Sequence, residues 1–157
     1  MDISSRLRSE DKQWCPPQLD VWKINFDGAF LESEKTGAFG VLWLDHCGHA
    51  VLAGAGRLET VKDVLSAEAQ ACLAALTTAS DQGIQRISLE SDSQVLVRAL
   101  QSGEYDQALG GVLFREAKFL MSMQFDLVSI TYAPQSCNRC AHDLARMDLS
   151  GRQIISL

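Results

Sequence analysis

The sequence lacks the long apolar segment that a membrane-spanning helix needs, which is about 20 residues. Its first residues, MDISSRLRSEDKQW, also lack the apolar centre of a secretory signal peptide. We therefore expect an intracellular protein, in the nucleus or the cytoplasm, with no membrane partner. An excess of positive charge is missing as well, because 14 Lys and Arg stand against 20 Asp and Glu, a net charge of -6. Any contact with nucleic acid must then be local or assisted by a metal.

Cysteine is too scattered for a disulfide framework. The chain has five cysteines, an odd number, which indicates reduced thiols. Two local groups contain ligands of the kind that zinc uses: Cys137 with Cys140, and His46 and Cys47 with His49. A structural zinc ion needs four ligands in a closed geometry, and neither group supplies them. We therefore expect a helix start at the first group and a β-turn at the second.

Length and composition predict one globular domain. The chain has 157 residues, of which 46% are hydrophobic and 22% charged. Residues 1–20 mix charges with Pro16 and Pro17 and show no period, which is typical of a flexible arm. We expect the ordered domain over residues 21–150 and a short tail over residues 151–157.

The spacing of apolar residues predicts five strands and four helices in the order βββαβααβα. Period-two patterns mark the strands and longer apolar stripes the helices. In chain order the expected elements cover residues 21–27, 37–45, 50–59, 64–80, 84–92, 93–103, 112–123, 125–133 and 138–147. This order predicts an α/β (α+β) fold with a five-stranded mixed sheet flanked by helices, in which the first, fourth and fifth strands are neighbours.

Four acidic residues are expected near one end of this sheet: Asp27, Glu68, Asp92 and Asp143. Each has a simpler explanation. Asp27 could open a turn, Glu68 could favour the start of its helix, Asp92 could cap the next helix, and Asp143 could pair with Arg139. Together they indicate a metal site, because clustered carboxylates repel one another unless a cation lies between them. Mg²⁺ takes such oxygen ligands, and two ions about 3.5 to 4 Å apart can promote phosphodiester hydrolysis.

The segments that carry these acids, NFDGA, SAEAQACLAAL, ESDSQ and NRCAHDLA, resemble the four motifs of type 1 ribonuclease H. They are most similar to its plant, retrotransposon-derived branch, called reverse-transcriptase-like. Domains of this branch often begin with a short W-x-P-P segment, such as Trp14-Cys15-Pro16-Pro17 in this chain. The resemblance covers about residues 14 to 150. The four motifs lie on the elements of the expected topology, which makes the set more specific than any single motif.

The resemblance implies Mg²⁺-dependent endonucleolytic cleavage of the RNA strand of an RNA:DNA hybrid by two ions, with Mn²⁺ as a possible substitute. Asp27, Glu68, Asp92 and Asp143 match the catalytic, metal-binding acids, with Asp27 bridging both ions, Glu68 and Asp92 serving one, and Asp143 serving the other. Gly28 and Gln94 match positions that contact the RNA minor groove, where the 2′-hydroxyl distinguishes RNA from DNA.

The sequence departs from this family in the loop before the last helix. Bacterial and retroviral members place a His there that is thought to help the product leave, but residues 131–137 read TYAPQSC and contain none. His142 is not expected to replace it, because on a helix it points about 100° away from Asp143.

Residues at the positions expected to bind the substrate also differ from those of the family. Plant members often carry Arg where this chain has Gln135, and bacterial members have asparagines at the positions of Val64 and Leu65. The basic helix of the bacterial enzyme also has no counterpart. Two alternatives to an active enzyme stay open: a catalytically weak or silent domesticated module that binds nucleic acid or protein, and a nuclease of the same fold that acts on other nucleic acids.

Overall fold

The computed structural model describes residues 21–136 and 138–149. The arm and the tail expected from the sequence lie outside the described residues. The described elements are the strands β1 Trp22–Leu31, β2 Thr36–Leu44, β3 Ala50–Leu58, β4 Arg86–Ser91 and β5 Leu127–Tyr132, and the helices α2 Val64–Asp81, α3 Gln94–Gln101, α4 Gly111–Gln124 and α5 Arg139–Leu149. Their order confirms the prediction of βββαβααβα.

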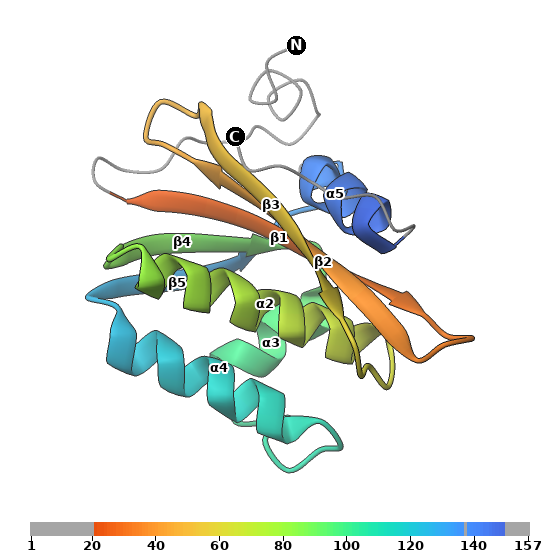
Figure 1. The fold of residues 1–157 in the computed structure, drawn as a ribbon. Helices are drawn as coiled ribbons and strands as arrows, with labels where there is room; N and C mark the ends of the chain where they lie inside the picture. The colour runs from red at the N-terminus through yellow and green to blue at the C-terminus, as the bar shows by residue number, and fades with distance from the viewer. Residues whose placement is uncertain (1–20, 137, 150–157) are drawn as a thin grey trace.

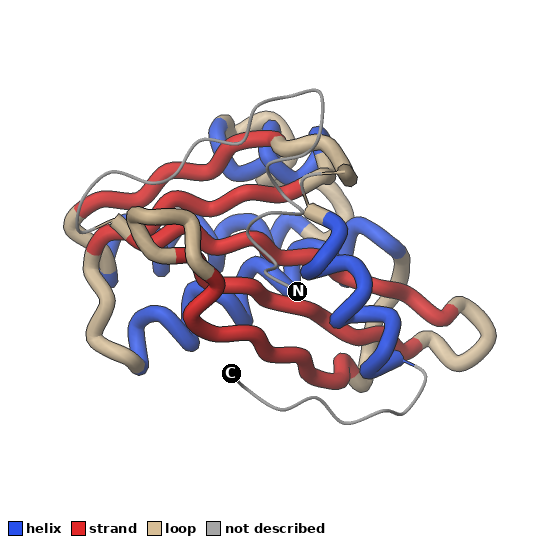
Figure 2. Tube along the Cα trace, turned by 90° about the horizontal axis from the view of Figure 1, so that it is seen from above, coloured by secondary structure: helices blue, strands red, loops and turns tan. Residues whose placement is uncertain are grey.

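The strands form one five-stranded sheet in the order β3-β2-β1-β4-β5. β1, β2 and β3 pair antiparallel, whereas β1 with β4 and β4 with β5 pair parallel. The first, fourth and fifth strands are thus neighbours, as predicted. Figure 2 shows the strands side by side with helices on both faces of the sheet.

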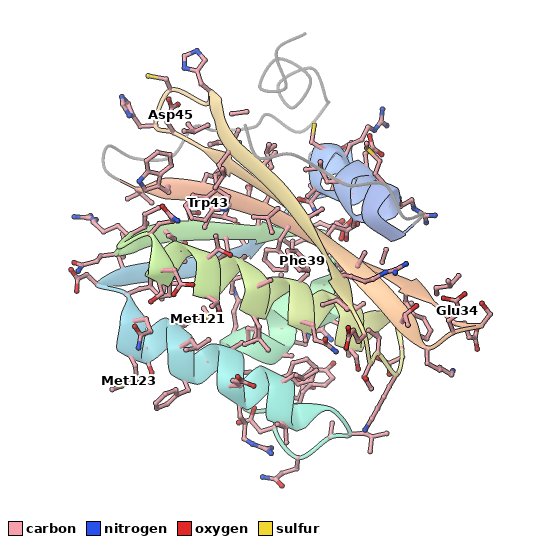
Figure 3. All side chains as sticks on the ribbon, viewed as in Figure 1. Glu34, Phe39, Trp43, Asp45, Met121 and Met123 are labelled. Atoms are coloured by element: carbon pink, nitrogen blue, oxygen red, sulfur yellow. The ribbon has the colours of Figure 1, made fainter. Side chains whose placement is uncertain are left out.

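The helices cover the two faces unequally. α2, α3 and α4 lie on one face, and α5 is the one described helix on the other, against β1, β2 and β3 (Figure 1). The larger core fills the side of α2, where Ile24 and Phe26 of β1 meet Cys72 and Leu76. Trp43 belongs to this core, whereas Met123 at the end of α4 is exposed (Figure 3).

Two glycines let helices approach the sheet closely. A Cβ at Gly28 would lie 2.4 Å from the backbone carbonyl of Ala67 in α2, and a Cβ at Gly40 would lie 2.1 Å from the carbonyl oxygen of Ala141 in α5. Real side chains do not tolerate such distances, so α2 and α5 can pack at these points only against glycine. Both helices are therefore held against β1 and β2 close to Asp27.

The turn between β2 and β3 is the β-turn that the sequence predicts. Gly48 has a φ of 82° and donates its backbone N–H to Asp45 at 3.0 Å. Asp45, Cys47 and His49 place one possible ligand atom each within 4.8 Å of one another.

In the part of the chain that the structure describes, no helix is both long and apolar enough to cross a bilayer.

Candidate active site

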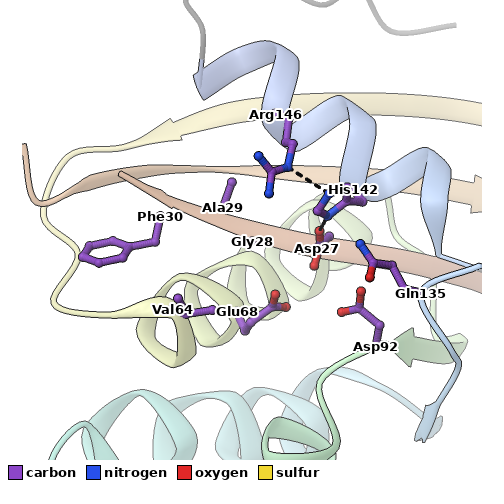
Figure 4. A pocket seen from close by; sticks show the side chains of 10 residues that line it. All are labelled: Asp27, Gly28, Ala29, Phe30, Val64, Glu68, Asp92, Gln135, His142 and Arg146. Atoms are coloured by element: carbon purple, nitrogen blue, oxygen red, sulfur yellow. Dashed lines mark hydrogen bonds and ion pairs between the residues drawn. The ribbon is translucent and has the colours of Figure 1, made fainter. Parts of the chain in front are cut away.

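Three of the four predicted carboxylates meet between β1, α2 and β4. Asp27, Glu68 and Asp92 each offer an oxygen, and these oxygens all lie within 4.8 Å of one another. The side chains point toward one another in the cleft shown in Figure 4. Asp27 is 2% exposed and Glu68 is 5% exposed, so the cluster lies at the bottom of the cleft rather than on an open surface.

Asp27 lies inside its strand and not at the strand end that the sequence predicts. β1 continues to Leu31 because its second half pairs with β2. The parallel pairing with β4, by contrast, ends at Asn25 and Glu90. Asp27 is therefore the second residue after the last pair between β1 and β4. Its carboxylate and that of Asp92, which directly follows β4, both lie where the two strands separate.

Glu68 is held in the second turn of α2, whose N-terminus is capped by Asp63 through a hydrogen bond from the backbone N–H of Ser66. Burial, and then the nearby Asp27, raise the pKa of Glu68 to about 10. Its Oε2 is buried and accepts no hydrogen bond. An oxygen of this kind is costly to bury. A cation between the three carboxylates would satisfy it, so these residues fit a divalent metal with oxygen ligands.

Asp92 follows β4 and does not cap the next helix. The cap of α3 is Ser93, whose Oγ accepts a hydrogen bond from the backbone N–H of Leu96 at 3.1 Å. The side chain of Asp92 is thus left to face the cluster. Burial, followed by the charge of Asp27, raises the pKa of Asp92 to about 6. The simpler explanation of Asp92 as a cap is excluded by this geometry.

The fourth position of the cluster is occupied by His142 and not by Asp143. His142 Nδ1 lies 2.6 Å from Asp27 Oδ2, and Arg146 Nε donates a hydrogen bond to His142 Nε2 at 2.9 Å (Figure 4). Asp143 is exposed and does not line the cleft. The structure therefore brings three of the predicted acids together and places an imidazole where the sequence predicts the fourth.

Asn138 explains why α5 has this rotation. Its buried side chain donates a hydrogen bond to the backbone carbonyl of Phe26 at 2.8 Å, directly beside Asp27. Its Oδ1 accepts no hydrogen bond, so the side chain does not cap α5. Residues four apart share a helix face. The spacing from Asn138 to His142 is the signal in the sequence that could have identified His142.

The remaining wall of the cleft combines polar and apolar side chains. Gly28 lines it, as do Phe30, Val64 and Gln135. Gln94, predicted to contact RNA, is an exposed residue at the start of α3 and is not part of this wall. Arg146 supplies the positive charge on this wall. The local sequence pattern does not predict that this charge lies in the cleft.

Comparisons with known proteins agree with this arrangement. A family described as reverse transcriptase-like matches residues 25–148. RNase H1 from the halophilic archaeon Halobacterium salinarum NRC-1 is similar in structure, with a TM-score of 0.75 and 29% identity over 83% of this chain and 98% of that chain. No curated protein sequence matches the chain.

Two more distant structures share the fold. The N-terminal RNase H domain of a Mycobacterium tuberculosis protein has a TM-score of 0.70 and 20% identity, over 83% of this chain and 96% of that chain. LC11-RNase H1 in complex with an RNA/DNA hybrid has a TM-score of 0.71 and 18% identity, over 82% of this chain and 98% of that chain. Because the family match spans residues 25–148, which is most of the sequence, the chain belongs to the reverse transcriptase-like family and its domain is of the ribonuclease H type 1.

Proposed function

We propose that this protein hydrolyses the RNA strand of RNA:DNA hybrids as an endonuclease that depends on a divalent metal. The observation that carries the proposal is the cluster of Asp27, Glu68 and Asp92, whose oxygens lie within 4.8 Å of one another in a cleft of a domain of this family. The products expected of this chemistry are a 3′-hydroxyl on one fragment and a 5′-phosphate on the other.

Mg²⁺ is the expected ion, and Mn²⁺ can replace it. The three carboxylates would hold the ion, and Asp27 and Glu68 would do so from rigid elements because both are buried. A bound divalent ion activates a water and neutralises charge that develops on the phosphate. The orphaned Oε2 of Glu68 supports this assignment, since an unpaired buried oxygen needs a partner.

The chain's own residues position the substrate around this cluster. Gly28 lines the cleft, and because α2 packs directly against it, it offers the substrate only its backbone. Arg146 lines the same cleft and can donate to a phosphate oxygen, while Phe30 and Val64 offer apolar contact. We assign recognition of the RNA strand to this wall, where a 2′-hydroxyl would distinguish RNA from DNA. Gln94 would contact the hybrid from outside it, at the start of α3.

The test is cleavage of an end-labelled RNA:DNA hybrid in Mg²⁺, with duplex DNA and duplex RNA of the same sequence as competitors. We expect the hybrid to be cut, the cut to disappear in EDTA, and the duplexes to compete poorly. A preference for either duplex would favour a nuclease with another substrate. Failure to cut any of the three substrates would contradict a catalytic role.

A binding module without catalysis is the second candidate, and one contact favours it. His142 Nδ1 lies 2.6 Å from Asp27 Oδ2 and so competes with a metal for one of the two oxygens of this carboxylate. This candidate predicts that the hybrid binds with the same affinity in EDTA and in Mg²⁺, and that Asp27→Asn leaves the affinity unchanged. An affinity that rises with Mg²⁺ in the wild-type chain and not in Asp27→Asn would exclude it.

A further inference from the structure

The two ring nitrogens of His142 both have partners, and these partners fix which nitrogen carries the proton. Arg146 Nε approaches Nε2 at 2.9 Å, and a guanidinium nitrogen can only donate a hydrogen bond. Nε2 must therefore hold a lone pair. A ring with a bare Nε2 carries its proton on Nδ1, which then donates to Asp27 Oδ2 at 2.6 Å.

This arrangement leaves His142 with no free nitrogen to offer a metal. A ligating nitrogen needs an available lone pair, but Nδ1 carries the proton and the lone pair of Nε2 already accepts a hydrogen bond from Arg146. The permanent charge of Arg146 also lies beside the ring and repels a cation placed there. A fourth carboxylate at this position would have had neither restriction.

The exposed neighbour cannot take over the missing role. Asp143 follows His142 in α5, but it is exposed and does not line the cleft. The helix is held in this rotation by the hydrogen bond from Asn138 to the carbonyl of Phe26 and by the close approach of Ala141 to Gly40. Rotating α5 to bring Asp143 inward would break both contacts.

We propose that this site binds one divalent cation, through Asp27, Glu68 and Asp92, and that the His142–Arg146 pair occupies the place where a fourth carboxylate would complete a site for a second ion. The inference rests on the proposed function, because it takes the three carboxylates as a metal site. It replaces the two ions that the resemblance implies with one ion and one fixed positive charge.

The test counts Mn²⁺ ions bound to the metal-free protein, from the loss of the free-ion signal in electron paramagnetic resonance, with no nucleic acid present. We expect one tightly bound ion per wild-type chain and two in His142→Asp, which restores a carboxylate on the inward face. The matched control is Asp143→Asn on the adjacent exposed residue, which should still bind one. Two ions in the wild type, or one in a folded His142→Asp, would overturn the proposal.

A second measurement does not depend on how that variant folds. Long-range ¹⁵N–¹H correlation spectra of the wild-type imidazoles report which ring nitrogen carries the proton. We expect His142, assigned by its loss in His142→Gln, to be protonated on Nδ1, and a proton on Nε2 alone would overturn the proposal. If no Mn²⁺ binds at all, the proposed function fails as well. If two ions bind and the hybrid is cut, only the inference fails.

Discussion

Glu68→Gln should stabilise the metal-free protein, because it removes a carboxyl group that is costly to ionise where it lies. In the folded chain, burial and the neighbouring Asp27 raise the pKa of Glu68 from 4.5 to about 10. At pH 7 the unfolded chain releases the proton and the folded chain keeps it. The difference in proton binding therefore opposes folding over the interval from pH 4.5 to 7.

The magnitude follows from this interval. It spans about 2.5 pH units, and each unit corresponds to about 1.4 kcal/mol, so the penalty at pH 7 is about 3 kcal/mol. Gln has nearly the same shape and can still donate a hydrogen bond to Asp27, but it does not titrate. We expect Glu68→Gln to raise the free energy of unfolding at pH 7 by up to about 3 kcal/mol.

The sign of the pH dependence separates this explanation from a simple packing effect. Below the unfolded pKa, the carboxyl group is protonated in both the folded and the unfolded chain, so it imposes no penalty on folding. As the pH rises from 4.5, the wild type should therefore lose stability relative to Glu68→Gln. Urea unfolding of both proteins in EDTA at pH 4.5, 5.5 and 7 measures the difference. A variant that is less stable than the wild type at pH 7, or a difference that does not change with pH, would refute the reasoning.

Three further predictions concern the core, the close approach of α2, and the pH dependence of metal binding. Leu76 is fully buried, so Leu76→Ala should lower the free energy of unfolding by about 2 to 5 kcal/mol, whereas the partly buried Leu73 should cost less on the same change; urea unfolding compares them. Gly28→Ala should force α2 away from β1, because its Cβ would meet the Ala67 carbonyl. We expect it to lower the free energy of unfolding by about 1 to 3 kcal/mol. It should also weaken Mn²⁺ binding, which calorimetry measures. Because the pKa of Asp92 is raised to about 6, protons should compete with the metal, and Mn²⁺ affinity measured by calorimetry should be weaker at pH 5.5 than at pH 7.5. Equal stability losses for the two leucines, unchanged Mn²⁺ affinity in Gly28→Ala, or a metal affinity independent of pH would contradict the respective prediction.

The fold could be predicted from the sequence because each element has a strong local pattern. The alternation of Ile24 and Phe26 with polar residues marks β1, and the close apolar spacing after Asp63 marks α2. The end of β1 could not be predicted in the same way. Whether the strand stops at Asp27 or continues to Leu31 depends on pairing with β2, which is a tertiary contact.

The candidate site could be predicted only in part. Asp27, Glu68 and Asp92 are positioned by the elements that carry them, and local patterns place those elements. The fourth position depends on how α5 is rotated, and one residue along a helix changes the direction of a side chain by about 100°. That rotation is set by the bond of Asn138 to β1 and by the packing of α5 on Gly40. Neither contact is visible in the sequence of α5 alone.

The central claim is that the cluster around Asp27, and not the exposed acid next to His142, carries out hydrolysis. The most direct measurement is the rate of cleavage of a labelled RNA:DNA hybrid in Mg²⁺ by the wild type, Asp27→Asn and Asp143→Asn at equal concentrations of folded protein. We predict that Asp27→Asn abolishes cleavage and that Asp143→Asn cuts at nearly the wild-type rate, because only Asp27 lies in the cleft. Loss of cleavage in Asp143→Asn, with Asp27→Asn still active, would contradict the account.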